Sequence, residues 1–117
     1  MQNKESLYEA FAELSYAVAI SDGVVEQEEI DAVVNASKDH PIQKMILTQF
    51  HSKNLDASIA QSYKNILDIH RDFRLVDEYP FLINIIEELA KKSIKDVSEL
   101  EESVIGAVLE GLKKKLM

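Results

Sequence analysis

The stretch from Ser21 to Glu29 holds the densest group of side chains in this chain that could do chemistry. It reads Ser-Asp-Gly-Val-Val-Glu-Gln-Glu-Glu and places four acidic side chains beside a glycine. Carboxylate oxygens are the ligands that hard cations such as Ca²⁺ and Mg²⁺ prefer. A turn that brings Asp22, Glu26 and Glu29 together could therefore hold a divalent cation, with water completing its coordination shell.

The spacing does not fit a standard EF-hand loop. Such a loop needs oxygen ligands at its first, third, fifth and twelfth positions and a glycine at its sixth. With Gly23 at the sixth position, Asp22 and Glu29 fall on the fifth and twelfth. Val18 and Ile20 then fall on the first and third positions, and neither has a side-chain oxygen. The sequence excludes a standard EF-hand and leaves a smaller acidic site.

The same stretch has a purely structural interpretation. Asp22 and Gly23 are typical turn residues. Glu26, Glu28 and Glu29 would lie in the first turn of the next helix, where each negative charge is stabilised by ~0.3–1 kcal/mol. From the residues alone, this capping interpretation is favoured over the cation site.

The residues from Ala19 to Glu29 resemble the signature of the tellurite-resistance TerB-like domain family. In that family an apolar helix leads into an Ala-x-Ala/Ser-Asp-Gly turn, and a valine and a Glu-Glu pair open the next helix. Asp22 and Glu29 match the acidic positions of the family, and Gly23 matches its turn glycine. The resemblance implies a compact, non-catalytic helical domain linked to tellurite resistance and stress responses in bacteria. It also implies weak binding of a divalent cation, Ca²⁺ or Mg²⁺, at the acidic turn.

A second turn, at residues 93–98, departs from the family pattern. Where the family often repeats Asp-Gly, this chain reads Ser-Ile-Lys-Asp-Val. The glycine is missing, and Lys95 would oppose a cation. Asp96 and Glu102 are the candidate remnants of a site there. The resemblance therefore supports a single acidic turn in this protein more than a paired site.

Three histidines are the other candidates for metal binding or proton transfer: His40, His51 and His70. They lack the i, i+4 spacing of a helical metal-binding pair. His70 shares a helix face with apolar residues and is expected to pack in the core, and His40 is expected in a turn. No nucleophile, nucleotide or cofactor motif appears. We therefore expect no enzymatic activity.

Composition restricts the partners. The 117 residues suffice for one domain, and the 21 acidic and 13 basic residues give a net charge of −8. This charge disfavours nucleic acids and anionic membranes, since both attract basic surfaces. It suits a basic protein partner, and an acidic protein–protein interaction module is the alternative function. There is no cysteine and no apolar run of membrane-spanning length, so a cytoplasmic protein is expected.

Apolar residues recur at helical spacing throughout the chain. The pattern predicts a compact all-α domain over residues 1–117, with about six helices. The expected elements are a helix from about Lys4 to Ser21 that Gly23 ends, a second from near Glu26 to before Pro41, a third opened by Pro41, a fourth capped by Asp56, a fifth capped by Asp77, and a sixth opened by the capping box Ser98-Glu99-Leu100-Glu101.

The first and last helix pairs look like a weak duplication, comparing residues 11–34 with 81–108. We therefore expect these pairs side by side with pseudo-twofold symmetry, and the turns at 22–26 and 94–98 at one end. The buried stripe of the last helix is predicted to contain Val104, Ala107, Val108 and Leu112, and that of the fifth helix to begin at Phe81. Close packing is expected to explain Gly106 and Gly111.

Overall fold

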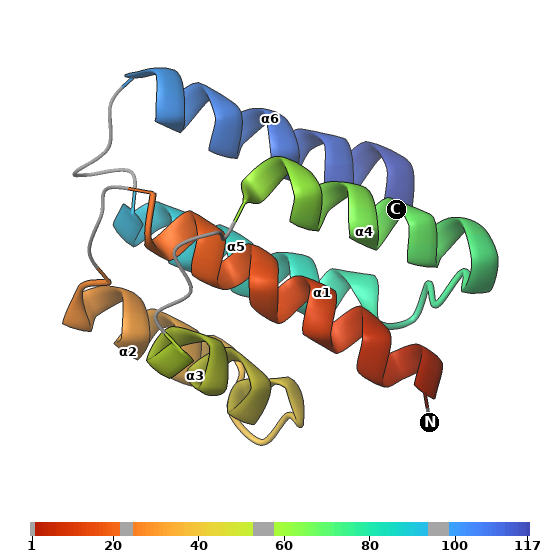
Figure 1. Cartoon of the computed structure of the whole chain (residues 1–117), viewed down its shortest axis with the longest axis horizontal. Coiled ribbons are helices and arrows are strands. Elements are labelled where there is room, and N and C mark those ends of the chain that lie inside the picture. Colours follow the sequence, from red (N-terminus) through yellow and green to blue (C-terminus); the bar gives the residue numbers. More distant parts are fainter. Residues whose placement is uncertain (1, 22–24, 53–57, 94–98) are drawn as a thin grey trace.

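The computed structural model describes residues 2–21, 25–52, 58–93 and 99–117. Within these ranges the chain forms six α-helices and no strand, which confirms the predicted all-α fold (Figure 1). The helices are α1 (Gln2–Ala19), α2 (Gln27–Ala36), α3 (Ile42–Ser52), α4 (Ile59–Phe73), α5 (Tyr79–Ser93) and α6 (Glu99–Leu116). No helix in the described part of the chain combines the length and apolar character needed to cross a bilayer.

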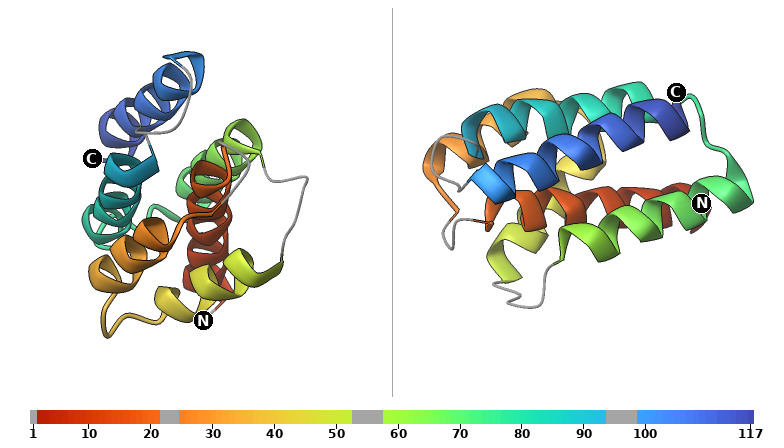
Figure 2. Two further views of the ribbon diagram at one scale, coloured as in Figure 1. Left: turned by 90° about the vertical axis from the view of Figure 1, so that its left-hand side faces the viewer. Right: turned by 90° about the horizontal axis from the view of Figure 1, so that it is seen from above.

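The helices form two layers of three (Figure 2). In one layer α1 lies between α3 and α4, and in the other α5 lies between α2 and α6. The two central helices, α1 and α5, pack on each other across the layers. Each central helix thus has neighbours on three sides, and these two helices supply most of the buried side chains.

The predicted pseudo-twofold symmetry is wrong. α1 and α5 do lie side by side and end at the same side of the molecule (Figure 1). A twofold axis that exchanged them would also exchange α2 with α6, and α6 would then lie beside α1. Instead, α2 and α6 flank the same helix, α5, and α6 makes its remaining contacts mainly with α4. The turn residues 22–24 and 94–98 lie outside the described residues.

Burial on α1 is broader than one stripe. Leu7, Phe11, Leu14 and Val18, which recur at three- and four-residue steps, are all buried. Tyr16 is buried as well, because α3, α4 and α5 together cover most of the helix circumference. The breadth of this buried surface follows from the central position of α1.

The predicted stripe of α6 is partly wrong. Val108 and Leu112 are buried as expected, but Ile105 takes the place of Val104, which is 41% exposed. Ala107 is exposed too. Both sets of residues have helical spacing, so the periodicity alone does not tell which set faces the core.

The two glycines of α6 have different surroundings. A Cβ atom at Gly111 would lie 3.0 Å from Cζ of Tyr63, so α4 packs closely against the glycine as predicted. At Gly106 an added Cβ would have no other atom within 4 Å. Close packing therefore does not explain Gly106, and that prediction is wrong.

Two helix starts also differ from the predictions. The N-cap of α4 is Ser58, whose side chain accepts a hydrogen bond from Gln61 N–H at 3.2 Å. The predicted cap Asp56 lies outside the described residues. α5 begins after Glu78 rather than Asp77, because the Glu78 carbonyl accepts the first helical hydrogen bond. The other predicted helix signals, Gly23 and the capping box at residues 98–101, include positions outside the described ranges.

The stripe of α5 likewise begins earlier than predicted. Tyr79 is fully buried, whereas Phe81 is 37% exposed. Leu82, Ile85 and Leu89, which continue the stripe, are buried. Phe81 instead stacks on His40 of the α2–α3 connection.

Candidate functional site

Glu29 is the most deeply buried of the predicted acidic residues that the structure describes. It is in the first turn of α2 and is 1% exposed. Its Oε1 atom accepts a hydrogen bond from the backbone N–H of Glu26, the N-cap residue, at 2.7 Å. Its Oε2 atom accepts a hydrogen bond from the hydroxyl of Ser93, the last residue of α5. Both carboxylate oxygens therefore bind donors of the protein itself.

These contacts explain how an acidic side chain is tolerated in the interior. A buried carboxylate is costly unless hydrogen bonds replace its lost water. A helix N-terminus supplies free N–H groups and a favourable dipole, and hydrogen bonds to charged groups are stronger than neutral ones. Glu29 thus caps α2 and fastens its start to the end of α5, a residue 64 positions away in sequence. The capping interpretation accounts for the described contacts of Glu29.

The other two predicted ligands have different positions. Glu26 is exposed at the N-cap of α2. Asp22 lies outside the described residues, as does Asp96 of the second turn, while Glu102 is exposed in the first turn of α6. Within the described ranges, no three His, Asp or Glu side chains gather as a metal site. The predicted trio with Asp22 stays a hypothesis.

His70 packs as the sequence predicts. Its Nδ1 atom lies 2.8 Å from the hydroxyl of Tyr79, and the two rings meet edge to face with centroids 5.2 Å apart. The same hydroxyl accepts a hydrogen bond from Leu75 N–H at 3.2 Å. His70 is therefore held in a structural hydrogen-bond network between α4 and α5.

His40 lies in the α2–α3 connection, as predicted, and it also joins two helices. Its ring stacks on Phe81 of α5 at a centroid distance of 4.5 Å and meets the edge of Tyr8 of α1 at 5.1 Å. Its Nδ1 atom accepts a hydrogen bond from Ile42 N–H at 3.1 Å, at the start of α3. Burial lowers the pKa of His40, and the negative charge of Glu78 opposes this effect in part. The neutral ring is thus the form that fits this position.

The neighbouring contact strengthens the same junction. The Tyr8 hydroxyl donates a hydrogen bond to the Glu78 carboxylate. Burial raises the pKa of Tyr8 to about 12, and the bond to Glu78 contributes in the same direction. Tyr8 therefore stays protonated and acts as a donor. The cluster connects α1, α5 and the start of α3, which is a structural role.

A second acidic feature, absent from the sequence predictions, runs along α1. Two surface grooves flank this helix, one of about 310 Å³ against α4 and one of about 570 Å³ against α3. Glu9 and Glu13 line both grooves. Their i, i+4 spacing places them on one face of the helix. That spacing is visible in the sequence, and it is the signal from which this feature could have been predicted.

No ion pair in the described part of the protein neutralises the glutamates on this face, and Lys44 of α3 lines the larger groove together with Glu9 and Glu13. Glu5, Glu9 and Glu13 take part in no ion pair among the described residues. Partial burial raises the pKa of Glu13, and the charge of Glu9 raises it further. Ionised Glu9 and Glu13 therefore repel each other across one helical turn. A cation placed between them would be stabilised by both.

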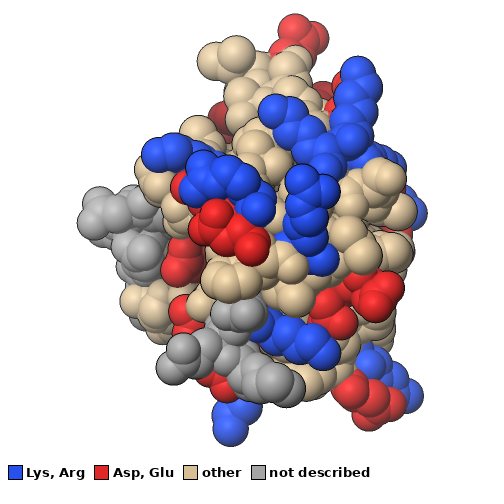
Figure 3. Space-filling view, turned by 90° about the vertical axis from the view of Figure 1, so that its right-hand side faces the viewer, with Lys and Arg blue, Asp and Glu red and all other residues tan. Residues whose placement is uncertain are grey.

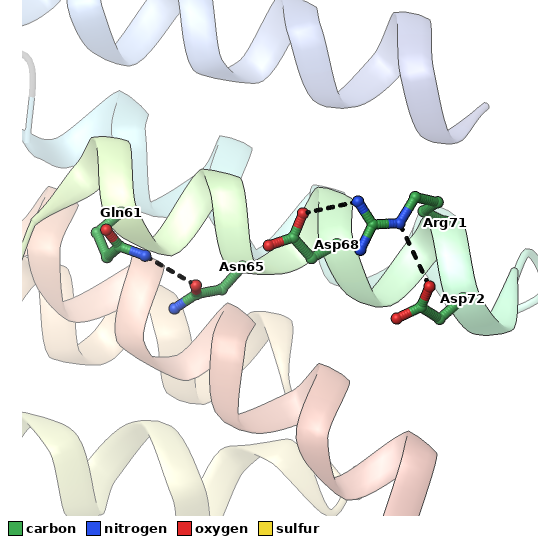
Figure 4. Close-up of polar contacts among 5 residues, drawn as sticks. All are labelled: Gln61, Asn65, Asp68, Arg71 and Asp72. Carbon is green, nitrogen blue, oxygen red and sulfur yellow. Dashed lines mark hydrogen bonds and ion pairs between the residues drawn. The ribbon is translucent and has the colours of Figure 1, made fainter.

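On the side of α4 that faces this groove, in contrast to α1, acidic side chains have a basic partner. There Arg71 lies 3.6 Å from Asp68 and 3.3 Å from Asp72, and Gln61 donates a hydrogen bond to Asn65 at 3.0 Å (Figure 4). Asp68 lines the same groove as Glu9. Its charge is partly offset by Arg71, so the unbalanced charge of the groove comes from α1.

No protein-family model, curated protein or solved structure matches this chain. The candidate site is therefore defined by its own geometry.

Proposed function

We propose that this protein is a non-catalytic interaction module that binds a basic segment of a partner protein along α1. One observation supports the proposal most directly. Glu9 and Glu13 line the grooves on both sides of α1, and no described residue of this chain pairs with them. The net charge of −8 favours the approach of a cationic partner over the whole surface.

The two grooves suit different parts of such a segment. The groove against α4 presents Glu9, Glu13 and Asp68, and it would take Lys or Arg side chains. The groove against α3 includes the apolar groups of Ala12 and Met45, and it would take an apolar side chain. An amphipathic basic helix offers both kinds of side chain on neighbouring faces.

The cation-binding hypothesis has less support from the geometry. Glu29 is buried, and both of its oxygens accept hydrogen bonds from the protein, so it would have to give up these bonds or share its oxygens with an ion. The resemblance to the TerB-like family, with its link to tellurite and stress responses, rests on the sequence from Ala19 to Glu29. Both remain predictions for this chain.

A synthetic peptide with lysine and leucine at helical spacing tests the proposal. We expect titration of the peptide into ¹⁵N-labelled protein to shift amide resonances of α1, α3 and α4, with an affinity that falls as salt rises. An analogue with glutamate in place of lysine should not bind. The double variant Glu9→Gln, Glu13→Gln should weaken binding by about tenfold or more, since it removes the two carboxylates that line both grooves.

The variant Glu102→Gln is the matched control, because Glu102 is also a surface glutamate but lies on α6 and lines neither groove. It should leave the peptide affinity within about twofold of the wild type. Peptide binding that is insensitive to the α1 substitutions, or that shifts only residues of other helices, would reject the proposal.

A further inference from the structure

The two grooves beside α1 share their glutamates but differ in one charge of opposite sign. Glu9 and Glu13 line both grooves, so they do not determine on which side of the helix a cationic side chain binds. The groove against α4 adds Asp68, and the groove against α3 adds Lys44. Because α1 lies between α3 and α4 (Figure 2), the grooves lie on different sides of the helix. The residues that differ therefore decide which side chains each groove accepts.

Lys44 is the stronger of the two discriminating charges. Asp68 lies 3.6 Å from the guanidinium of Arg71, which offsets part of its charge. Lys44 is exposed on α3 and takes part in no ion pair among the residues that the structure describes. A second positive charge in this groove would be repelled by Lys44 while Glu9 and Glu13 attract it. A cation therefore gains less in the groove against α3 than in the groove against α4.

Apolar residues do not distinguish the grooves in the same way. The groove against α4 contains Ala10 and Ile69, and the groove against α3 contains Ala12 and Met45. A leucine side chain would thus find apolar contacts on either side of α1. A charge that excludes one kind of side chain is a common source of binding specificity. The methylene groups of Lys44 also add apolar surface to the groove from which its ammonium group repels cations.

We propose that Lys44 determines the specificity of the α1 site, because it keeps basic side chains of the partner out of the groove against α3 and leaves that groove to an apolar side chain. The basic face of the bound segment then lies toward α4 and its apolar face toward α3. This inference rests on the interaction proposed for α1. It adds the orientation of the segment, and it identifies the partner as one whose basic and apolar side chains lie on separate helix faces.

Two helical peptides test the role of Lys44. The first has lysine on one face and leucine on the neighbouring face, and the second has lysine in place of the leucines. Titration of each peptide gives the ratio of their two dissociation constants. Lys44→Gln should shift this ratio about threefold in favour of the second peptide, and Lys44→Glu about tenfold, because repulsion is first removed and then replaced by attraction. Both shifts should shrink as the salt concentration rises.

Lys115→Gln is the matched control, because it changes the net charge by the same amount elsewhere on the surface. Lys115 is exposed in the last turn of α6 and lines neither groove. It belongs to the end of the molecule at which α4 and α6 finish, and basic side chains gather over the upper part of that end (Figure 3). The control should leave the ratio within about 1.5-fold of the wild-type value, since solvent and salt screen a charge outside the binding site. The Lys44 variants should stay folded, because Thr48 binds the backbone oxygen of Lys44 and not its side chain.

The possible outcomes separate this inference from the function on which it rests. If the wild type binds neither peptide, the interaction proposed for α1 fails, and the role of Lys44 fails with it. If the peptides bind along α1 but the ratio is the same in the wild type and both Lys44 variants, or shifts equally with Lys115→Gln, the interaction stands and the role of Lys44 is overturned. A nitroxide label on the lysine face of the first peptide should broaden amide resonances of α4 more than those of α3, and a label on the leucine face should do the opposite. The reverse pattern would overturn the orientation.

Discussion

The substitution Glu29→Gln separates the structural role of the acidic corner from cation binding. Glutamine keeps the shape of the side chain but removes its charge and turns one acceptor oxygen into an N–H donor. Glu29 accepts hydrogen bonds from Glu26 N–H and from the Ser93 hydroxyl, so after the change one of these donors faces another donor. A hydrogen bond to a charged group is worth ~1.5–3 kcal/mol. We expect the free energy of unfolding to fall by about 2 kcal/mol.

The assay is urea unfolding followed by circular dichroism at pH 7 in the presence of EDTA. The midpoint should decrease while the slope stays constant, since the substitution changes stability and not the surface exposed on unfolding. Ser93→Ala should cost about 1–2 kcal/mol, because it removes one donor from a buried carboxylate. The double variant should lose less than the sum of the two single losses, because both substitutions disrupt the same contact.

Glu102→Gln provides the control, since Glu102 lies in the first turn of α6 but is exposed. Its effect should stay within ~0.5 kcal/mol. If Glu29 acted mainly as a cation ligand, removal of its charge without metal would relieve repulsion and leave the protein as stable as the wild type or more so. Wild-type stability of Glu29→Gln in EDTA would therefore refute the structural account.

Three further predictions test other parts of the structure. Gly106→Ala should raise the free energy of unfolding by ~0.5–1 kcal/mol through helix propensity, whereas Gly111→Ala should lower it by about 1 kcal/mol because the added methyl displaces Tyr63. The urea midpoints of both variants, taken at low protein concentration, measure these changes in stability. When Tyr63 is replaced by alanine, Gly111→Ala should stabilise the protein instead of destabilising it. Equal effects of the two glycine substitutions would contradict the close packing of Tyr63 on Gly111. The pKa of His40 is lower in the folded than in the unfolded protein, because the folded protein disfavours the protonated ring. The contribution of His40 to the free energy of unfolding is therefore complete above pH ~6.5 and declines as the pH falls below that value. His40→Asn should flatten this slope between pH 7 and 5, and an unchanged slope would show that other groups cause it. If the acidic turn binds a cation, calorimetric titration with Ca²⁺ or Mg²⁺ should give a saturable heat of binding with the wild type and not with Asp22→Asn, and equal heats would exclude Asp22 as a ligand.

The sequence predicted the helices well because each one depends on local spacing. Six apolar stripes, two prolines and the polar residues at helix starts are all read within a few positions of each other. The predicted caps of α4 and α5 differ from those in the structure, because neighbouring polar residues compete for the cap position. Ser58 and Glu78 adjoin these helices in the structure.

The tertiary contacts could not be predicted in the same way. The bond between Glu29 and Ser93 joins residues 64 positions apart, and no local pattern indicates it. α6 contains two apolar stripes, and only its place beside α4 and α5 determines that Ile105 is buried and Val104 is not. The apparent duplication of the first and last helix pairs led to the wrong prediction of twofold symmetry for a similar reason. Amphipathic helices resemble one another in sequence whatever their neighbours are.

The fully buried Tyr79 has a consequence for how the chain folds. Its hydroxyl binds both His70 and Leu75, so one side chain ties the end of α4, the following connection and the start of α5 together. All three residues lie within ten positions of sequence, and the entropy lost in closing so short a loop is small. Contacts this local form early relative to distant ones. We therefore expect the α4–α5 hairpin to be formed in the folding transition state, in which case Tyr79→Phe should slow folding more than it speeds unfolding.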